Sequence, residues 1–289
     1  MWLPNEWKDY KLVDSADGEK LEYWKNIILC RPDPQAIWSD KMSPELWKNS
    51  DARYLRSNTG GGKWQFQNKN MPESWTVKYK ELTFNIKPMG FKHTGLFPEQ
   101  AVNWDWFSGL IKNANRPIRV LNLFAYTGGA TVAALAAGAE VVHVDASKGM
   151  VTWAKENVIS SGLGDKFVRF IVDDVKKFVQ REARRGRVYD GIIMDPPSYG
   201  RGPNGEVWRI EDELYPLIQD CMKIMSDNPL FFLINSYTTG LSQTVLTNVL
   251  SLTIKKRYGG LVSADEIGLP IGNGELILPC GISGRWQKK

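Results

Sequence analysis

VLNLFAYTGG, residues 120–129, joins an apolar run to a loop with two adjacent glycines. The run, which extends from residue 118 to residue 123, predicts a buried strand. The glycines allow a tight turn and a close backbone approach before the start of a helix. Because ligands of open α/β sheets bind beyond the carboxyl ends of the strands, this loop is of the type that holds a nucleotide. It lacks the Gly-x-Gly-x-x-Gly pattern, so a nicotinamide dehydrogenase is a distant alternative.

Apolar runs and helix-like stretches alternate from this segment to the C-terminus. Further strands are predicted at 140–144, 169–172, 191–194 and 230–235, and helices at 211–225 and 241–252. Two last runs, 266–271 and 275–279, flank Gly272-Asn273-Gly274, which is a strong hairpin signal. The pattern predicts the α/β fold class: a Rossmann-like, doubly wound, mostly parallel seven-stranded sheet with an antiparallel C-terminal hairpin.

The beginning of the chain follows a different pattern. Strand-like stretches at 23–31 and 74–86 are separated by turn clusters, and nine of the 12 tryptophans lie within the first 106 residues. We therefore expect a small β-rich domain over residues 1–88, a candidate for substrate binding, and a second domain over 89–289. A packed core accounts for the tryptophans more simply than an interface or a base-stacking surface, because large aromatic side chains dominate the cores of small β domains.

The composition excludes several classes of protein. With 289 residues, 43% hydrophobic and 24% charged, the chain has the composition of an ordinary globular protein. No apolar run approaches the roughly 18 residues of a membrane span, and the first ten residues lack a signal-peptide core, so we expect a cytoplasmic protein without a membrane partner. Three scattered cysteines and two histidines show no metal-ligand spacing, so no metal is expected. The net charge of +5 permits a polyanionic partner without requiring one.

Acidic residues follow successive predicted strands. Asp145 comes about twenty residues after Leu123, the spacing at which a carboxylate accepts hydrogen bonds from ribose hydroxyls. After the third strand, Asp174 can accept from an adenine amino group while the backbone N–H of Val175 reaches a ring nitrogen. Either aspartate alone could be a helix N-cap. Their regular placement favours an adenosine-binding site.

The fourth strand ends in Asp195-Pro196-Pro197-Ser198-Tyr199. Prolines fix the backbone and remove N–H donors, so carboxylate and carbonyl acceptors can face a substrate amino group while the tyrosine offers a stacking surface. Two prolines alone would be an ordinary loop signal, and the tyrosine alone could belong to the core. An acid directly before them, at the end of a buried strand, favours a functional motif.

These motifs resemble class I S-adenosylmethionine-dependent methyltransferases, and among them the branch of the 23S ribosomal RNA large-subunit methyltransferases. The resemblance extends from about Lys92 to the C-terminus and rests on residues 120–129, 144–147 and 195–199. Residues 94–100, TGLFPEQ, are similar to the branch's segment at the methionine end of the cofactor, with Glu99-Gln100 where the family usually has Asp-x-Arg. The first domain does not look like the RNA-binding PUA domain of several relatives.

The resemblance implies that residues 89–289 form a methyltransferase domain with S-adenosyl-L-methionine as its cofactor. It implies that the cofactor-binding residues are Thr94, Leu96, Phe97, Gln100, Asn122, Phe124, Ala125, Tyr126, Gly128, Asp145, Ala146, Ser147, Asp174, Val175 and Asp195. The catalytic residues are expected to be Asp195, Pro196, Pro197 and Tyr199.

The expected chemistry is alignment of an acceptor with a methyl group that the cofactor already activates. Asp195 and the Pro196 carbonyl would hold the hydrogens of an exocyclic amine, and Tyr199 would stack on the base. Methylation of cytosine C5 needs a cysteine nucleophile, which resembling enzymes place after the fifth strand. Residues 234–238 contain no cysteine, and Cys221 falls within a predicted helix. A guanine or adenine nitrogen is therefore favoured, although Ser198 intervenes where an aromatic residue commonly follows the prolines directly.

The basic stretch 176–187 supports an RNA partner, with ribosomal RNA as the first candidate, because basic side chains can contact phosphates. Further cations lie at Arg201, Arg209 and 255–257. The alternative is a helix whose basic end complements its dipole. Tyr199, Tyr237 or Trp208 could stack on an exposed base. We expect methylation of a nucleobase nitrogen in ribosomal or other RNA. A small-molecule or protein acceptor and a catalytically silent cofactor- or RNA-binding protein stay open, as does the oligomeric state.

Overall fold

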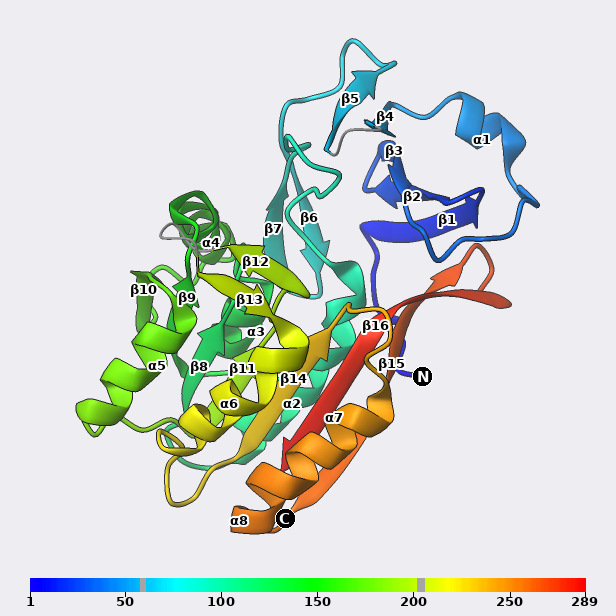
Figure 1. Ribbon diagram of the computed structural model, residues 1–289. Helices are drawn as coiled ribbons and strands as arrows, with labels where there is room; N and C mark the ends of the chain where they lie inside the picture. Colours follow the sequence, from blue (N-terminus) through cyan, green and yellow to red (C-terminus); the bar gives the residue numbers. More distant parts are fainter. Residues whose placement is uncertain (58–60, 202–205) are drawn as a thin grey trace. The chain divides into compact units, whose positions relative to one another are not determined.

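The structure is a computed structural model that describes residues 1–57, 61–201 and 206–289 (Figure 1). The chain forms two compact units. The α/β unit comprises Met1, Val102–Ile267 and Gly281–Lys289, and the β-rich unit comprises Trp2–Ala101 and Gly268–Cys280. Two long C-terminal strands, β15 (Leu261–Ile271) and β16 (Leu276–Gln287), therefore contribute residues to both units.

The β-rich unit extends past residue 88, where the domain boundary was expected. Arg31 donates a hydrogen bond to the Lys92 carbonyl at 3.2 Å, and the Trp7 indole N–H donates to the Pro98 carbonyl at 3.0 Å. The backbone N–H of Lys87 also donates to the Thr94 carbonyl, at 3.2 Å. Because these bonds fasten residues 92–98 to the first strands, this segment packs with the β-rich unit.

The sheet of the α/β unit has the predicted topology. Its parallel strands are β8 (Arg119–Leu123), β9 (Glu140–Asp145), β10 (Val168–Val172), β11 (Gly191–Met194) and β14 (Phe231–Ser236). Their order is β10-β9-β8-β11-β14, followed by β16 antiparallel to β14 and then β15. This arrangement confirms the predicted Rossmann-like seven-stranded sheet with its antiparallel C-terminal hairpin.

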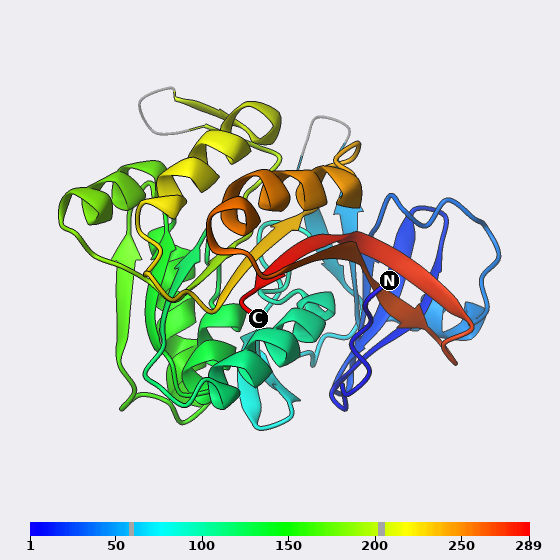
Figure 2. The ribbon, with the colours of Figure 1, turned by 90° about the horizontal axis from the view of Figure 1, so that it is seen from below.

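Helices cover both faces of this sheet (Figures 1 and 2). One face holds α2 (Ala101–Asn113), α3 (Gly129–Ala136) and α4 (Lys148–Ser160). The other holds α5 (Val175–Arg184), α6 (Ile210–Met222) and α7 (Gln243–Leu250), which continues through a π-helical turn (Ser251–Lys255) into α8 (Lys256–Tyr258). The side chains beneath α5, α6 and α7 form a continuous buried cluster that includes Phe178, Leu217, Ile218, Phe232 and Leu246. No helix among the described residues is long and apolar enough to cross a membrane.

The β-rich unit contains a mixed sheet and a separate hairpin. The sheet comprises β1 (Tyr10–Ala16), β2 (Glu19–Trp24), β3 (Ile27–Pro32), β4 (Ala52–Arg56) and β5 (Gly62–Phe66), with the tip of β15 beside β1. The short helix α1 (Pro44–Lys48) precedes β4, and β6 (Trp75–Tyr79) pairs with β7 (Leu82–Ile86) in the hairpin. Strand β5 lies at the edge of the sheet.

Two of the predicted strand-like stretches in this unit are each interrupted by a turn. The stretch 23–31 turns between Trp24 and Ile27, and the stretch 74–86 turns between Tyr79 and Leu82. Lys25 and Lys80 open these two-residue turns in the left-handed conformation, with φ of 64° and 53°. Lysine is not a residue that signals such a turn, and so the pattern reads as one continuous strand.

The tryptophans of this unit divide between core and surface. Trp24 and Trp47 are buried, as expected for a packed core. Trp64 on edge strand β5 is only half-buried, and its ring stacks on the exposed ring of Phe66 with the centroids 6.5 Å apart. The expected core therefore accounts for part of this aromatic content, and β5 presents Trp64 and Phe66 toward the surface.

Candidate cofactor and acceptor site

The loop after β8 is held in an unusual backbone conformation. Phe124, Tyr126 and Gly128 all have positive φ, at 53°, 50° and 81°. For a non-glycine residue this conformation costs about 1–3 kcal/mol, and it concentrates at functional sites. The Ala125 N–H donates to the Val144 carbonyl at 3.1 Å, which ties the strained loop to the end of β9. The predicted nucleotide loop is therefore a rigid feature between two strand ends.

Asp145 braces the same loop from the end of β9. One carboxylate oxygen accepts the backbone N–H of Tyr126 and the other accepts the backbone N–H of Ser147, both at 2.8 Å. Burial raises the pKa of Asp145 above its ordinary value, in opposition to these two hydrogen bonds, which lower it. Each oxygen retains a lone pair for a further donor. This donor-accepting geometry fits the ribose hydroxyls of an adenosine cofactor.

A buried polar chain supports the loop from inside the α/β unit. Asn122 at the end of β8 donates to the Thr131 hydroxyl at 3.0 Å, and that hydroxyl lies 2.9 Å from Nδ1 of His143. Burial lowers the pKa of His143 to about 3, so its ring is neutral. Asn157 on α4 donates to the Thr127 carbonyl at 2.8 Å. Asn122 thus supports the loop through its side chain, and Asn157 is a further supporting residue that no sequence motif marks.

Two residues predicted to bind the cofactor are helix N-caps. Asp174 accepts the backbone N–H of Lys177 at 2.9 Å at the start of α5, and Ser147 accepts that of Met150 at 3.5 Å at the start of α4. Asp174 is exposed and Val175 is buried. For Asp174 the capping alternative therefore describes the side chain in this structure, and the contact of Asp174 and Val175 with the adenine ring stays a prediction.

The Asp195-Pro196-Pro197 motif lies beside the β8 loop. The Asp195 N–H donates to the Leu123 carbonyl at 3.4 Å, which places the motif at the end of β8. The Trp208 indole N–H donates to the Pro197 carbonyl at 2.6 Å, and its ring lies 5.2 Å from that of Phe124. Trp208 thereby joins the motif to the loop, a role beyond the stacking expected of it.

The residues after Pro197 form a small surface hairpin. Strand β12 (Tyr199–Arg201) pairs with β13 (Val207–Arg209). Tyr199 is 49% exposed, and its hydroxyl accepts a hydrogen bond from Arg201 at 2.7 Å. The Ser198 and Thr238 hydroxyls lie 2.7 Å apart, which joins the motif to the residues after β14. Residues from the ends of three parallel strands, β8, β11 and β14, therefore meet in one place.

Four of the predicted cofactor residues belong to the β-rich unit. Thr94, Leu96 and Gln100 are buried, and Phe97 precedes the short 3₁₀ helix η1 (Pro98–Gln100). The buried hydroxyl of Thr94 has no hydrogen-bond partner among the residues that the structure describes. A buried polar atom in this state is costly unless a ligand or water satisfies it. This orphaned hydroxyl fits the expected contact with a polar cofactor.

The basic stretch 176–187 is largely neutralised within the protein. Lys176 pairs with Glu213 at 2.5 Å and Lys177 with Glu206 at 3.2 Å. Arg185 pairs with Glu182 at 3.2 Å, and Arg181 forms an ion pair with Asp173. These pairs favour the alternative interpretation of α5 as a solvated helix face over a surface devoted to phosphates.

The comparisons with known proteins agree with this fold. Residues 47–215 match the family model described as S-adenosylmethionine-dependent methyltransferase, which covers more than half of the chain. A solved S-adenosylmethionine-dependent methyltransferase from Agrobacterium tumefaciens superposes with a TM-score of 0.94 at 37% identity, over 100% of this chain and 93% of that one. A putative methyltransferase solved with S-adenosylhomocysteine, SMU.776, reaches a TM-score of 0.73 at 19% identity over 98% and 76%, which is a likeness of fold.

Two curated relatives are ribosomal RNA large subunit methyltransferases. Enzyme I of Photobacterium profundum is 34% identical over 129 residues, 44% of this chain and 32% of the relative. Enzyme K/L of Shewanella frigidimarina is 31% identical over 147 residues, 50% of this chain and 20% of the relative. The chain therefore spans a third or less of the length of these relatives.

The chain belongs to the S-adenosylmethionine-dependent methyltransferase family. Its cofactor is S-adenosylmethionine, and the named relatives confirm the resemblance to the ribosomal RNA large-subunit branch.

Proposed function

We propose that this protein methylates a nitrogen of a nucleobase in RNA, with ribosomal RNA as the first candidate. The observation that supports this best is the junction of Asp195-Pro196-Pro197 with the loop that would hold the cofactor, through the Asp195 N–H and the Trp208 side chain. The names of the curated relatives support RNA as the substrate. A ribosomal RNA substrate would also place the protein in the cytoplasm.

The cofactor supplies a methyl group on a positively charged sulfur, so the protein's own residues have to bind, orient and exclude water. Asp145 would accept the ribose hydroxyls on a carboxylate already fixed by two backbone N–H groups. The carboxylate of Asp195 and the carbonyl of Pro196 would accept the two hydrogens of an exocyclic amine. The nitrogen lone pair would then point along the axis of transfer, which is the alignment that accelerates such a reaction.

The cysteines argue against a carbon acceptor. The residues at and after the end of β14 are Ser236, Tyr237 and Thr238, which provide no thiol. Cys221 is buried within α6, and burial raises the pKa of its thiol. Because the nucleophile for cytosine C5 chemistry is a thiolate, an inert buried thiol cannot serve. A nitrogen acceptor needs no such nucleophile.

The acceptor is tested by incubating the purified protein with radiolabelled S-adenosylmethionine and total RNA from cells that lack its gene. We expect labelled N-methylguanosine or N-methyladenosine when the nucleosides are analysed by mass spectrometry. Labelled 5-methylcytidine would contradict the nitrogen acceptor. RNA without label, together with bound cofactor, would favour a small molecule or a protein as the substrate.

The role of Asp195 is tested by substituting Asp195→Ala. We expect a loss of at least about 100-fold in kcat, the order seen when one positioned polar group is removed from a reacting centre. Cofactor affinity, measured by titration calorimetry, should change little. Asp165→Ala is the matched control, because Asp165 is an exposed aspartate of the same unit that precedes β10. Equal activity of the two variants would remove Asp195 from the mechanism.

A further inference from the structure

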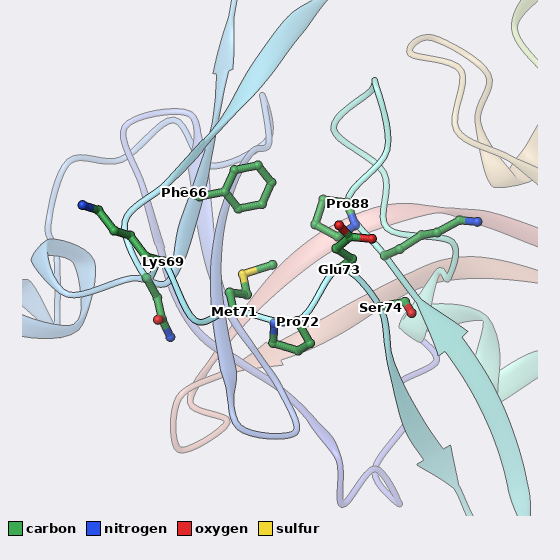
Figure 3. A pocket seen from close by; sticks show the side chains of 9 residues that line it. Phe66, Lys69, Met71, Pro72, Glu73, Ser74 and Pro88 are labelled. Carbon is green, nitrogen blue, oxygen red and sulfur yellow. The ribbon is translucent and has the colours of Figure 1, made fainter.

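A pocket of about 630 Å³ lies within the β-rich unit, lined by residues of a single stretch from β5 to the end of the β6–β7 hairpin (Figure 3). This β5 pocket has a size within the range of small-ligand sites. It is lined by Phe66, Asn68, Lys69, Met71, Pro72, Glu73, Ser74, Lys87 and Pro88. None of these residues was assigned to the cofactor or to the acceptor, so the pocket needs an explanation of its own.

Phe66 presents an aromatic surface to the pocket. It is the last residue of edge strand β5, and its side chain is 54% exposed. Its ring stacks on Trp64, with an interplanar angle of 26°, and the Trp64 indole N–H donates to the Met89 carbonyl at 2.8 Å. Figure 3 shows the ring directed into the pocket, with Met71 and Pro72 below it. An exposed ring of this kind offers a face for a flat ligand.

The polar groups of the pocket suit a nucleotide. Lys69 and Lys87 are exposed cations, and Figure 3 shows Glu73 beside Pro88, across the pocket from Phe66. Asn68 is fixed in place, because its amide donates to Asp51 at 2.6 Å and its oxygen accepts the Asn70 N–H at 2.9 Å. A wholly apolar ligand would make no use of the two cations or the carboxylate. A base with its flanking phosphates would use all three.

We propose that the β5 pocket binds one unstacked base of a single-stranded RNA segment, outside the base that receives the methyl group. Phe66 stacks on this base, Glu73 accepts an N–H from its edge, and Lys69 and Lys87 contact the adjoining phosphates. Aromatic faces combined with cations are the usual means of binding single-stranded RNA. The proposal rests on the proposed function, because it assumes that RNA is the substrate. The pocket would give RNA a contact surface apart from α5, whose cations are mostly paired internally.

The test measures binding of a fluorescein-labelled single-stranded RNA of about ten nucleotides by fluorescence anisotropy with the full-length protein. We expect Phe66→Ala to weaken binding by about 5- to 150-fold, the loss of one base–aromatic stack. Phe66→Tyr keeps the ring and should preserve the affinity. Phe167→Ala is the matched control, because Phe167 is 56% exposed in the α/β unit and should leave binding unchanged. If Phe66→Ala binds as tightly as the control, the proposal is overturned.

The cations are tested through the salt dependence of the same binding. Each phosphate contact to single-stranded RNA contributes about 0.7 to the slope of log K against log salt. Substituting Lys69→Gln and Lys87→Gln together should therefore reduce the slope by up to about 1.4. An unchanged slope would contradict the phosphate contacts.

Methyl transfer measured in parallel separates this proposal from the proposed function. A Phe66→Ala variant with a raised KM for RNA and an unchanged kcat supports both, because the residue then affects binding alone. Methylation of RNA with the same KM in variant and wild type overturns the β5 pocket and leaves the function intact. RNA binding that depends on Phe66 without methylation of any RNA supports the pocket and overturns the function. A protein that neither binds nor methylates RNA overturns both.

Discussion

At the level of single residues, the carboxylate of Asp145 has two roles. It fixes the loop after β8 through the Tyr126 and Ser147 N–H groups, and it is expected to accept the ribose hydroxyls. Burial raises its pKa, so the protonated form is reached at a higher pH than for an exposed aspartate. Protonation of the Asp145 carboxylate turns one of its oxygens into a donor, so the carboxyl group can accept fewer hydrogen bonds from the backbone N–H groups and the ribose hydroxyls. Because the folded-state pKa is raised, acid does not destabilise the fold through this group; it weakens cofactor binding instead.

We therefore predict that acid weakens the binding of S-adenosylmethionine. Because the pKa of Asp145 is raised, the loss of affinity should begin at a pH above 3.8, the ordinary pKa of an aspartate. Titration calorimetry over a series of acidic buffers measures this dependence. Asp145→Asn should bind the cofactor more weakly and lose the pH dependence. A variant that keeps the wild-type pH profile would show that another group is responsible.

At the level of elements, the turn from β8 into α3 depends on Gly128. Its φ is 81°, and an added Cβ would lie 2.9 Å from the Cβ of Ala154 on α4. We predict that Gly128→Ala lowers the free energy of unfolding by about 1–2 kcal/mol for the left-handed backbone and by about 1–3 kcal/mol more for overpacking. Urea unfolding measures this change.

Gly138 gives the matched control for this prediction. It has φ of 100°, and an added Cβ would meet no atom within 4 Å. Gly138→Ala should therefore show the backbone cost without the crowding, and the difference between the two variants isolates the contact with α4. Equal losses in both would contradict the crowding of Gly128.

The sequence allowed the parallel strands to be predicted because each is a compact apolar run with a helix after it. The predicted strand at 191–194 coincides with β11. The C-terminal hairpin was predicted too short, since β16 continues to Gln287 through residues that are not uniformly apolar. Gly281 and Gly284 are part of the reason: a Cβ at these positions would lie 2.7 Å from the Ser236 carbonyl oxygen and 3.0 Å from the Leu246 Cβ. Close packing against β14 and α7 is a tertiary constraint that no local pattern shows.

The same limit applies to the candidate site. The residues just after the strands could be located, because the carboxyl ends of parallel strands define the site of any such sheet. The links between them could not, because the contacts of Trp208 with Pro197 and Phe124 are tertiary and join residues that are apart in the sequence. The internal pairing of the α5 cations with Glu206 and Glu213 was hidden for the same reason.

At the level of the whole molecule, the β-rich unit contains a buried ion pair of good geometry. Arg31 donates to both carboxylate oxygens of Glu22, at 2.6 and 2.8 Å, and Tyr10 donates to the same carboxylate at 2.9 Å. Burial opposes the charge of Glu22, but Arg31 and Lys20 more than offset it and hold its pKa below the ordinary value. The stability that this pair contributes is present at neutral pH and is lost as the pH falls through that lowered pKa.

We predict that Arg31→Leu destabilises the protein by about 3–5 kcal/mol, because it removes the main ionic partner of a buried carboxylate. Adding Glu22→Leu should recover most of this loss. Since β15 and β16 belong to both units, differential scanning calorimetry should show a single transition that shifts as a whole. Two transitions, only one of them shifted, would show that the units unfold independently.

The sharing of β15 and β16 also sets the order in which the protein can be completed during synthesis. Leu12 on β1 pairs with Ile271, and Phe231 on β14 pairs with Gln287. Strands β1 and β14 are made well before these partners and expose unpaired backbone in the meantime, the kind of edge on which nascent chains aggregate. The sheet of each unit therefore lacks a neighbouring strand until β15 and β16 have been made.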